Sequence, residues 1–387
     1  MPRSPETSRL EIVDLARGLV IVLMALDHAR HLFHAGAYLG SPTDPATTTA
    51  AVFATRWVTH LCAPVFLLLA GVSAELRLTA SGDKPALSRF LASRGLWLIV
   101  LEVAVVNFAV NFNWDGLALQ VIWALGVAMI ALAALIWLPR AAVLTLAVAV
   151  IAGHNLLDPL TPADFGTLAP IWTLLHEGGP LPGAPFFVLY PVGPWIAVMA
   201  LGFAIGPLVR GGWAKDSRFA CLGAAALVGF LTLRGLNGYG DPQAWSAQAT
   251  PVRTVMSFLN VAKQPPSLDY LLATLGAAAM IIPLLARLPE KARSVLSVYG
   301  RVPLFFYVAH FFLIHGLMTI VGVAGGYPAE IFASVMSDPS RARMAGWGVG
   351  LPMVYGVWIF VLVGLYPACR WFGALKQRRS DWWLSYA

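Results

Sequence analysis

The sequence predicts an all-α fold: a polytopic transmembrane bundle of about ten helices. Three observations support this. First, 58% of the 387 residues are hydrophobic and only 12% are charged, whereas soluble domains carry about 25% charged residues. Second, apolar runs long enough to cross a bilayer recur along the whole chain. Third, the segments between them are too short for a separate soluble domain, so we expect one membrane domain over residues 1–387.

The apolar runs give the expected helices in order. Each is close to the length of about 20 residues that a membrane span needs. They lie near residues 13–33, 52–76, 90–110, 119–138, 141–157, 187–209, 218–234, 268–288, 296–322 and 346–368. The run at 141–157 is short. The Pro- and Gly-rich stretch 158–186 after it predicts an ordered external loop.

The distribution of Lys and Arg predicts the orientation of the chain. With the N-terminus inside, the inner connections hold about eighteen Lys and Arg residues and the outer ones about seven. This bias places both termini in the cytoplasm. The net charge of +7 is therefore a topology signal, and we expect no nucleic-acid partner. Cys62, Cys221 and Cys369 show no metal-ligand spacing, so no metal site is expected.

The first apolar run carries an unusual set of polar residues. Arg17 and His28 are about three helical turns apart, so they share a face about 16 Å apart along the axis. Keeping both in a membrane is costly, which indicates a polar seam along a cavity. Asp14 is spaced to pair with Arg17. Asp27 is a candidate to orient an imidazole, either that of His28 or, given the helical spacing, that of His31.

The second and ninth runs contain further candidates. Arg56 and His60 are four residues apart and share a face, either at a functional site or as an interfacial pair. Pro64 should interrupt that helix and free a backbone carbonyl. His310 lies near the middle of the ninth run and should face protein or water, or make an interhelical hydrogen bond.

The external stretch "RTVMSFLNVAKQPPSLDYLLATLG" is half apolar. Such a segment should be re-entrant or pack over the helix bundle, which would hold Asn260 and Lys263 near the site. Ordinary loop packing would explain it equally well. Ser267 is placed to cap the helix that follows. The chain contains no Walker A motif, no GxSxG elbow and no HExxH motif.

Five stretches together resemble bacterial proteins of the heparan-alpha-glucosaminide N-acetyltransferase catalytic-domain family. They are "RLEIVDLARGLVIVLMALDH", "RWVTHLCAPVFLLLAGVSAEL", "LQVIWALGVAM", "MSFLNVAKQPPSLDYLLATLG" and "YGRVPLFFYVAHFFLIH". The resemblance covers nearly the whole chain. The spacing of Arg17 and His28 is also similar to the signature of the related acyltransferase-3 enzymes. The resemblance implies a multi-pass protein of the bacterial cytoplasmic (inner) membrane with a catalytic histidine.

The resemblance further implies that acetyl-CoA, or another acyl-CoA, is the cytoplasmic co-substrate. The acyl group would pass to an amine or hydroxyl acceptor, usually a sugar, on the outer side. Lysosomal members place their active histidine after the first helix of the domain, so the catalytic histidine could be His28, His60 or His34. Inner arginines such as Arg89 and Arg94 could hold coenzyme A phosphates.

These inferences define the expected site and partners. The candidate catalytic residues are His28, His60 and Asp27, because histidine serves as base or nucleophile near neutral pH. Arg17, Arg56, Asn260, Lys263 and His310 are the candidate substrate-binding residues. The expected partners are the lipid bilayer and a small-molecule or glycan acceptor, and a homo-oligomer is left open. The alternative function is a proton-coupled transporter or flippase, which also uses buried Asp, Arg and His.

Overall fold

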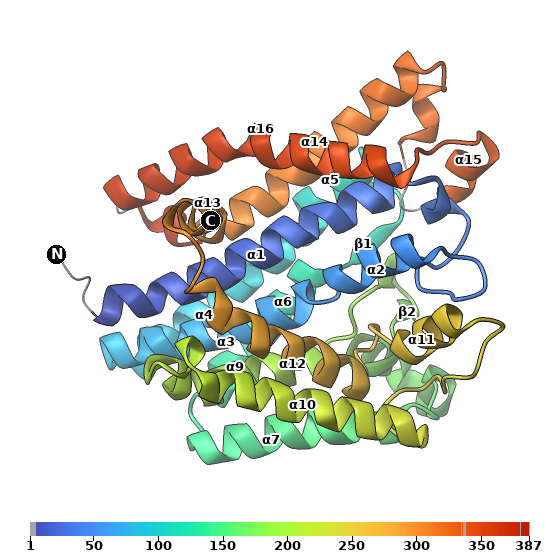
Figure 1. Ribbon diagram of the computed structural model, residues 1–387. Coiled ribbons are helices and arrows are strands. Elements are labelled where there is room, and N and C mark those ends of the chain that lie inside the picture. The colour runs from blue at the N-terminus through green and yellow to red at the C-terminus, as the bar shows by residue number, and fades with distance from the viewer. Residues whose placement is uncertain (1–4, 334, 336–337, 380, 387) are drawn as a thin grey trace.

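The computed structural model describes residues 5–333, 335, 338–379 and 381–386, and it is a bundle of long helices that run side by side (Figure 1). Eight helical segments are long and apolar enough to cross a membrane. With α1 (Pro5–Phe33), which carries several charges, and the shorter α6 (Val121–Leu135), they make ten passes in the described chain. The all-α transmembrane prediction is confirmed, and the run at 141–157 is a helix.

The remaining elements follow in chain order. The passes are α2–α3 (Ala50–Thr59 and Cys62–Ser81), α4–α5 (Lys84–Leu101 and Asn107–Asn111), α7 (Arg140–Gly153), α9 (Gly193–Arg210), α10 (Ser217–Leu236), α12 (Leu268–Leu285), α14 (Pro303–Ala324) and α16 (Leu351–Arg378). Shorter helices are α8 (Ala169–Trp172), α11 (Pro251–Leu259), α13 (Glu290–Gly300) and α15 (Pro339–Met344). Figure 1 shows that α1 begins and α16 ends at one end of the bundle, which we call the terminal end.

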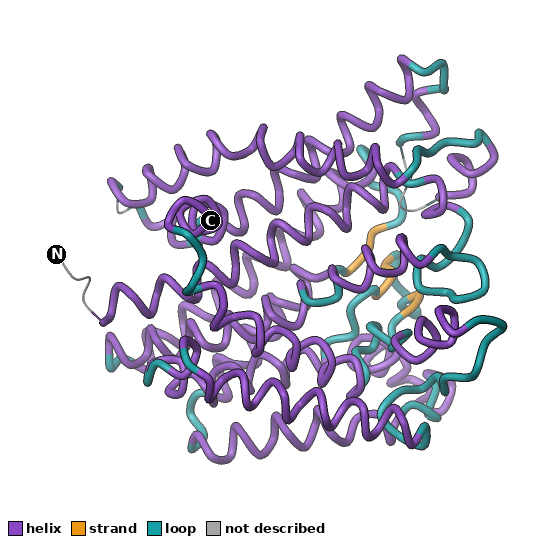
Figure 2. Tube along the Cα trace, viewed as in Figure 1, coloured by secondary structure: helices purple, strands orange, loops and turns teal. Residues whose placement is uncertain are grey.

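Connections and strands gather at the opposite end, which we call the loop end (Figure 2). Three short strands, β1 (Leu117–Leu119), β2 (Gly179–Pro180) and β3 (Phe186–Val188), form a sheet in the order β1-β3-β2. β1 is parallel to β3, and β2 is antiparallel to it. The stretch 158–186 is ordered as expected, with a 3-10 segment at Pro162–Leu168 and a π turn at Thr173–Glu177.

The run at 52–76 is divided near His60, where α2 ends and α3 begins. Pro64 has no N–H to donate to the carbonyl four residues earlier, so the His60 carbonyl oxygen is released. The Tyr270 hydroxyl of α12 donates a hydrogen bond to that oxygen at 2.8 Å. The expected effect of Pro64 is confirmed, and the released carbonyl ties α12 to the start of α3.

The run at 296–322 was expected to be one helix, and this was wrong. α13 ends at Gly300 and α14 begins at Pro303. A proline disfavours helical geometry in the residue before it, and Val302 has φ −130° and ψ 49°. α13 therefore lies across the bundle at the terminal end (Figure 1), and Arg301 occupies the corner.

The helix pair α4 and α6 crosses at two glycines. A Cβ atom on Gly95 would lie 2.4 Å from the Gly126 carbonyl oxygen, and one on Gly126 would lie 2.6 Å from that of Gly95. Only glycine permits so close a backbone approach. Gly95 and Gly126 therefore let α4 and α6 pack closely.

The segment before α12 packs on the bundle, which is one of the arrangements expected for it. The Trp57 indole N–H of α2 donates to the Leu259 carbonyl oxygen at 3.2 Å. Met256 of α11 is buried. The Ser267 hydroxyl accepts from the backbone N–H of Tyr270 at 3.1 Å and caps α12.

Candidate functional site

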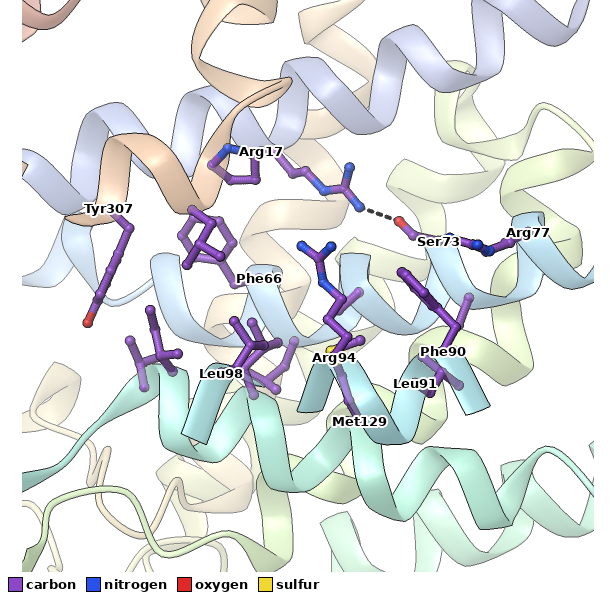
Figure 3. Close-up of a pocket in the computed structure, with 18 of the residues that line it drawn as sticks. Arg17, Phe66, Ser73, Arg77, Phe90, Leu91, Arg94, Leu98, Met129 and Tyr307 are labelled. Atoms are coloured by element: carbon purple, nitrogen blue, oxygen red, sulfur yellow. Dashed lines mark hydrogen bonds between the residues drawn. The ribbon is translucent and has the colours of Figure 1, made fainter. Parts of the chain in front are cut away.

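A cavity of about 410 Å³ lies among α1, α3, α4, α6 and α14. This volume is within the range of small-molecule sites, roughly 300–1,000 Å³. Figure 3 shows its lining, with Arg77 and Phe90 at one end and Tyr307 at the other. The two ends differ in chemistry, one being cationic and the other apolar.

The cationic part lies at the terminal end. It is lined by Arg17, Arg77, Arg94, Arg301 and Lys376. Arg17 donates a hydrogen bond to the Ser73 hydroxyl (Figure 3) and lies 3.7 Å from Asp14, so the predicted Asp14–Arg17 pair is confirmed. The Arg77 guanidinium stacks on Phe90 at 3.7 Å from the ring centre. A group of guanidinium and ammonium donors is suited to phosphate recognition.

The apolar part continues from there towards the middle of the bundle. Its lining includes Met24, Leu98, Leu125, Met129 and Tyr307. Met24 is one helical turn before His28 on α1. The Tyr307 ring centre lies 6.4 Å from that of His28, edge to face. His28 does not itself line the cavity, but its ring adjoins that of Tyr307, which does.

His28 forms a pair with His310 of α14. Its Nδ1 atom lies 2.6 Å from Nε2 of His310, and Nδ1 of His310 lies 3.0 Å from the Phe306 carbonyl oxygen. A carbonyl only accepts, so Nδ1 of His310 carries the hydrogen, and with both rings neutral its Nε2 accepts from Nδ1–H of His28. This arrangement leaves the lone pair of His28 on Nε2.

Asp27 is held by two arginines. Its Oδ2 atom lies 2.6 Å from Nη1 of Arg56, and its Oδ1 atom lies 3.1 Å from Nη2 of Arg30. Both carboxylate oxygens are thus engaged, and no Asp27–histidine hydrogen bond occurs among the described residues. The structure brings the candidates Asp27 and Arg56 together as an ion pair that joins α1 to α2.

His60 and His34 lie in different surroundings from His28. His60 is 3% exposed, and its Nδ1 atom has no hydrogen-bond partner. Its ring packs edge-on against Tyr270 at 5.4 Å. His34 accepts a hydrogen bond from the Gly36 N–H through Nδ1 at 3.1 Å and caps a 3-10 turn. Neither histidine lines the cationic cavity.

The loop candidates Asn260 and Lys263 lie in different surroundings. The Asn260 carbonyl oxygen accepts from Nη2 of Arg234 at 2.9 Å, and both residues line a polar cavity of about 250 Å³ at the loop end. Lys263 does not line that cavity; its ammonium lies 5.3 Å from the centre of the Tyr190 ring. Burial lowers the pKa of Lys263 to about 7.

Three residues of interest were missed in the sequence. Ser73 and Tyr307 line the cavity, and each is an isolated polar group on an apolar helix. Glu102 is fully buried and accepts the backbone N–H of Trp123, in the first turn of α6, at 3.0 Å through Oε2. Glu102 also begins the π-helical turn between α4 and α5. Glu102 could have been singled out from the sequence, because a carboxylate inside an apolar membrane run usually has a functional or structural role.

Comparison with known proteins adds a family. A family model described as heparan-alpha-glucosaminide N-acetyltransferase, catalytic, matches residues 9–237. The matched region contains Arg17, His28, Arg56 and His60, whereas His310 lies beyond it. No curated protein matches the chain. Because the family match covers more than half of the 387 residues, the chain belongs to the heparan-alpha-glucosaminide N-acetyltransferase catalytic family, a family of membrane-embedded acetyltransferases.

Proposed function

We propose that the protein transfers an acetyl group from cytoplasmic acetyl-CoA to an amine or hydroxyl of a sugar acceptor at the outer side of a bacterial inner membrane. One observation carries this proposal: a cavity that is cationic at the terminal end extends to Tyr307, whose ring adjoins His28 of the histidine pair. The positive-inside bias supports the cytoplasmic placement of the terminal end.

The two parts of the cavity match the two parts of acetyl-CoA. The diphosphate and 3′-phosphate would bind the guanidinium groups at the terminal end, including those of Arg77 and Arg94. The pantetheine arm would extend along the apolar walls. Arg17 and His28 are about 16 Å apart along α1, a distance that an extended pantetheine chain can span. The thioester would then lie beside His28.

In this proposal His28 acts as the general base. Its Nε2 lone pair accepts the proton of the acceptor N–H or O–H as that nitrogen or oxygen attacks the thioester carbonyl carbon. The new C–N or C–O bond forms and the C–S bond breaks. The imidazolium then returns the proton to the departing thiolate. His310 orients the ring through the Nδ1–H hydrogen bond and stabilises the required tautomer.

His60 is the competing centre. Its unpartnered Nδ1 atom makes it a reasonable base. Neither His60 nor His28 lines the cavity that we assign to the donor. The ring of His28, however, adjoins Tyr307 of the lining, whereas that of His60 packs on Tyr270, which lies outside the lining. Asp27, held by Arg30 and Arg56, is assigned a positioning role in this proposal.

The experiment compares His28→Ala with the matched variant His60→Ala. Membranes from expressing and control cells receive radiolabelled acetyl-CoA, with glucosamine as the acceptor probe, and labelled product and labelled protein are both measured. His28→Ala should lower turnover by about a hundredfold or more, with insertion and thermal stability in detergent retained. His60→Ala should retain most of the turnover.

Two outcomes would contradict the proposal. Loss of activity in His60→Ala with activity retained in His28→Ala would move the centre to α2–α3. If membranes that contain the wild-type protein label neither endogenous acceptors nor glucosamine above the control membranes, acetyl transfer itself is rejected.

A further inference from the structure

A second cluster of titratable side chains lies at the loop end, outside the cavity described above. It consists of His154, Asp158 and His176. His154 begins the 3-10 turn that follows α7, Asp158 ends that turn, and His176 lies in the π turn after α8. One potential ligand atom from each residue lies within 4.8 Å of the other two.

His154 has an unusual environment. It is 5% exposed, and neither of its ring nitrogens has a hydrogen-bond partner. A buried polar group that is left without a hydrogen-bond partner is destabilising. The backbone of Pro266 lies beside the ring, outside hydrogen-bonding geometry in this structure. The imidazole is therefore buried with unused ligand capacity.

The other two residues are already oriented towards each other. Nε2 of His176 lies 3.1 Å from Oδ1 of Asp158. The second oxygen of Asp158 accepts from Nδ2 of Asn155 at 2.8 Å. Asn155 in turn accepts from the buried backbone N–H of Leu268 at 2.9 Å. Trp172 packs against His176 with ring centres 4.8 Å apart. Supporting contacts of this kind hold metal ligands in place.

We propose that His154, Asp158 and His176 bind one divalent transition-metal ion of the zinc type. Two imidazoles and one carboxylate are a familiar three-ligand set for zinc, with a fourth position left for water. Zn–N and Zn–O distances near 2.0–2.1 Å place the ligand atoms of a tetrahedral site about 3.3 Å apart. The ligand atoms here lie within 4.8 Å of one another, so binding an ion requires the side chains to move closer together. No metal site was expected from the sequence because only the cysteines were considered, and His176 follows Asp158 by 18 positions, outside any helical spacing with His154 and Asp158.

The bound ion would link the stretch 158–186 to the turn after α7 and, through that turn, to the start of α12. It would hold His176 against His154 in the 3-10 turn that follows α7. Asn155 of the same turn accepts the backbone N–H of Leu268, the first residue of α12. The inference does not depend on the acetyltransferase proposal, since none of the three ligands lines the donor cavity.

The test uses the full-length protein in detergent. After treatment with a chelator and its removal, ZnCl₂ is titrated by calorimetry, and Co²⁺ is added in a parallel sample to record its visible absorption. We expect one ion per chain, a rise in melting temperature on zinc addition and the intense visible bands of four-coordinate Co²⁺. His154→Ala and His176→Ala should weaken zinc binding by about a hundredfold or more.

Glu177→Gln is the matched control. Glu177 is exposed and adjoins His176, so this change removes a negative charge without removing a ligand, and it should leave zinc affinity unchanged. Asp158→Asn gives a second ligand variant if either alanine variant fails to fold. Absence of saturable zinc binding to the chelated wild type, or equal affinity in the wild type and a folded ligand variant, would overturn the proposal.

Discussion

Removal of the His310 imidazole tests whether His310 sets the tautomer of His28. In the wild type, Nδ1–H of His28 donates to Nε2 of His310 at 2.6 Å. His310→Ala leaves that donor unpaired in a buried site, which costs about 1–3 kcal/mol. Because 1.4 kcal/mol corresponds to a factor of ten in rate, kcat should fall by about 5- to 150-fold. The KM for acetyl-CoA should stay nearly constant, since His310 does not line the donor cavity.

The control for this prediction is His310→Gln. The glutamine amide oxygen can replace Nε2 as the acceptor, so this variant should recover most of the lost kcat and restore the pH profile of the wild type. The assay is acetyl transfer by purified protein across a range of acetyl-CoA concentrations and pH values. A loss confined to KM, or a glutamine variant as slow as the alanine variant, would refute the reasoning.

Three further predictions concern the cationic cavity, the loop and the topology. Arg94→Glu should raise the KM for acetyl-CoA at least about tenfold, as expected for a lost charge-assisted contact. Arg89 is exposed and lies outside the lining, so Arg89→Glu should leave the KM unchanged. Equal effects of the two variants in steady-state kinetics would reject this placement of the phosphates. Burial lowers the pKa of Lys263 from 10.5 to about 7, so between those pH values the unfolded chain holds a proton that the folded chain lacks, and stability should rise with pH. Lys263→Met should flatten this rise in thermal unfolding scans, and an unchanged slope would contradict the shift. Reporter fusions after Ser81 should read cytoplasmic and those after Gln248 external; a cytoplasmic signal at Gln248 would exclude the proposed orientation.

The ten helical passes were readable in the sequence because the signal for a membrane helix is local. About 20 apolar residues suffice to identify one, whatever the rest of the chain does. The division near His60 was also readable, since Pro64 removes a specific N–H. The division before α14 was overlooked, although it also has a proline as its cause: Pro303 disfavours helical geometry in Val302. The strands at the loop end are two or three residues long, which is too short for any periodicity to show.

The site was harder to predict because it depends on which helix faces meet. Periodicity places Arg17 and His28 on one face of α1. Arg17 lines the cavity, whereas His28 does not. Nothing local indicates that His310, 282 positions later, meets His28. The same limit explains Asp27. Its neighbours in sequence suggested a histidine partner, whereas Arg56 reaches it from another helix at 2.6 Å.

The ring stack around His28 has a consequence for the permeability of the membrane. A cavity inside a membrane-spanning bundle must not become a path for ions across the bilayer. The His28 ring stacks on Phe311 of α14 with centres 4.3 Å apart, and it is hydrogen-bonded to His310 of the same helix in nearly the same plane, so His28 is packed among aromatic rings of α14. The hydrogen bonds of the histidine pair end at the Phe306 carbonyl oxygen. A carbonyl oxygen holds no transferable proton, so the imidazole pair can take up a proton during a reaction without forming a wire that would dissipate a proton gradient.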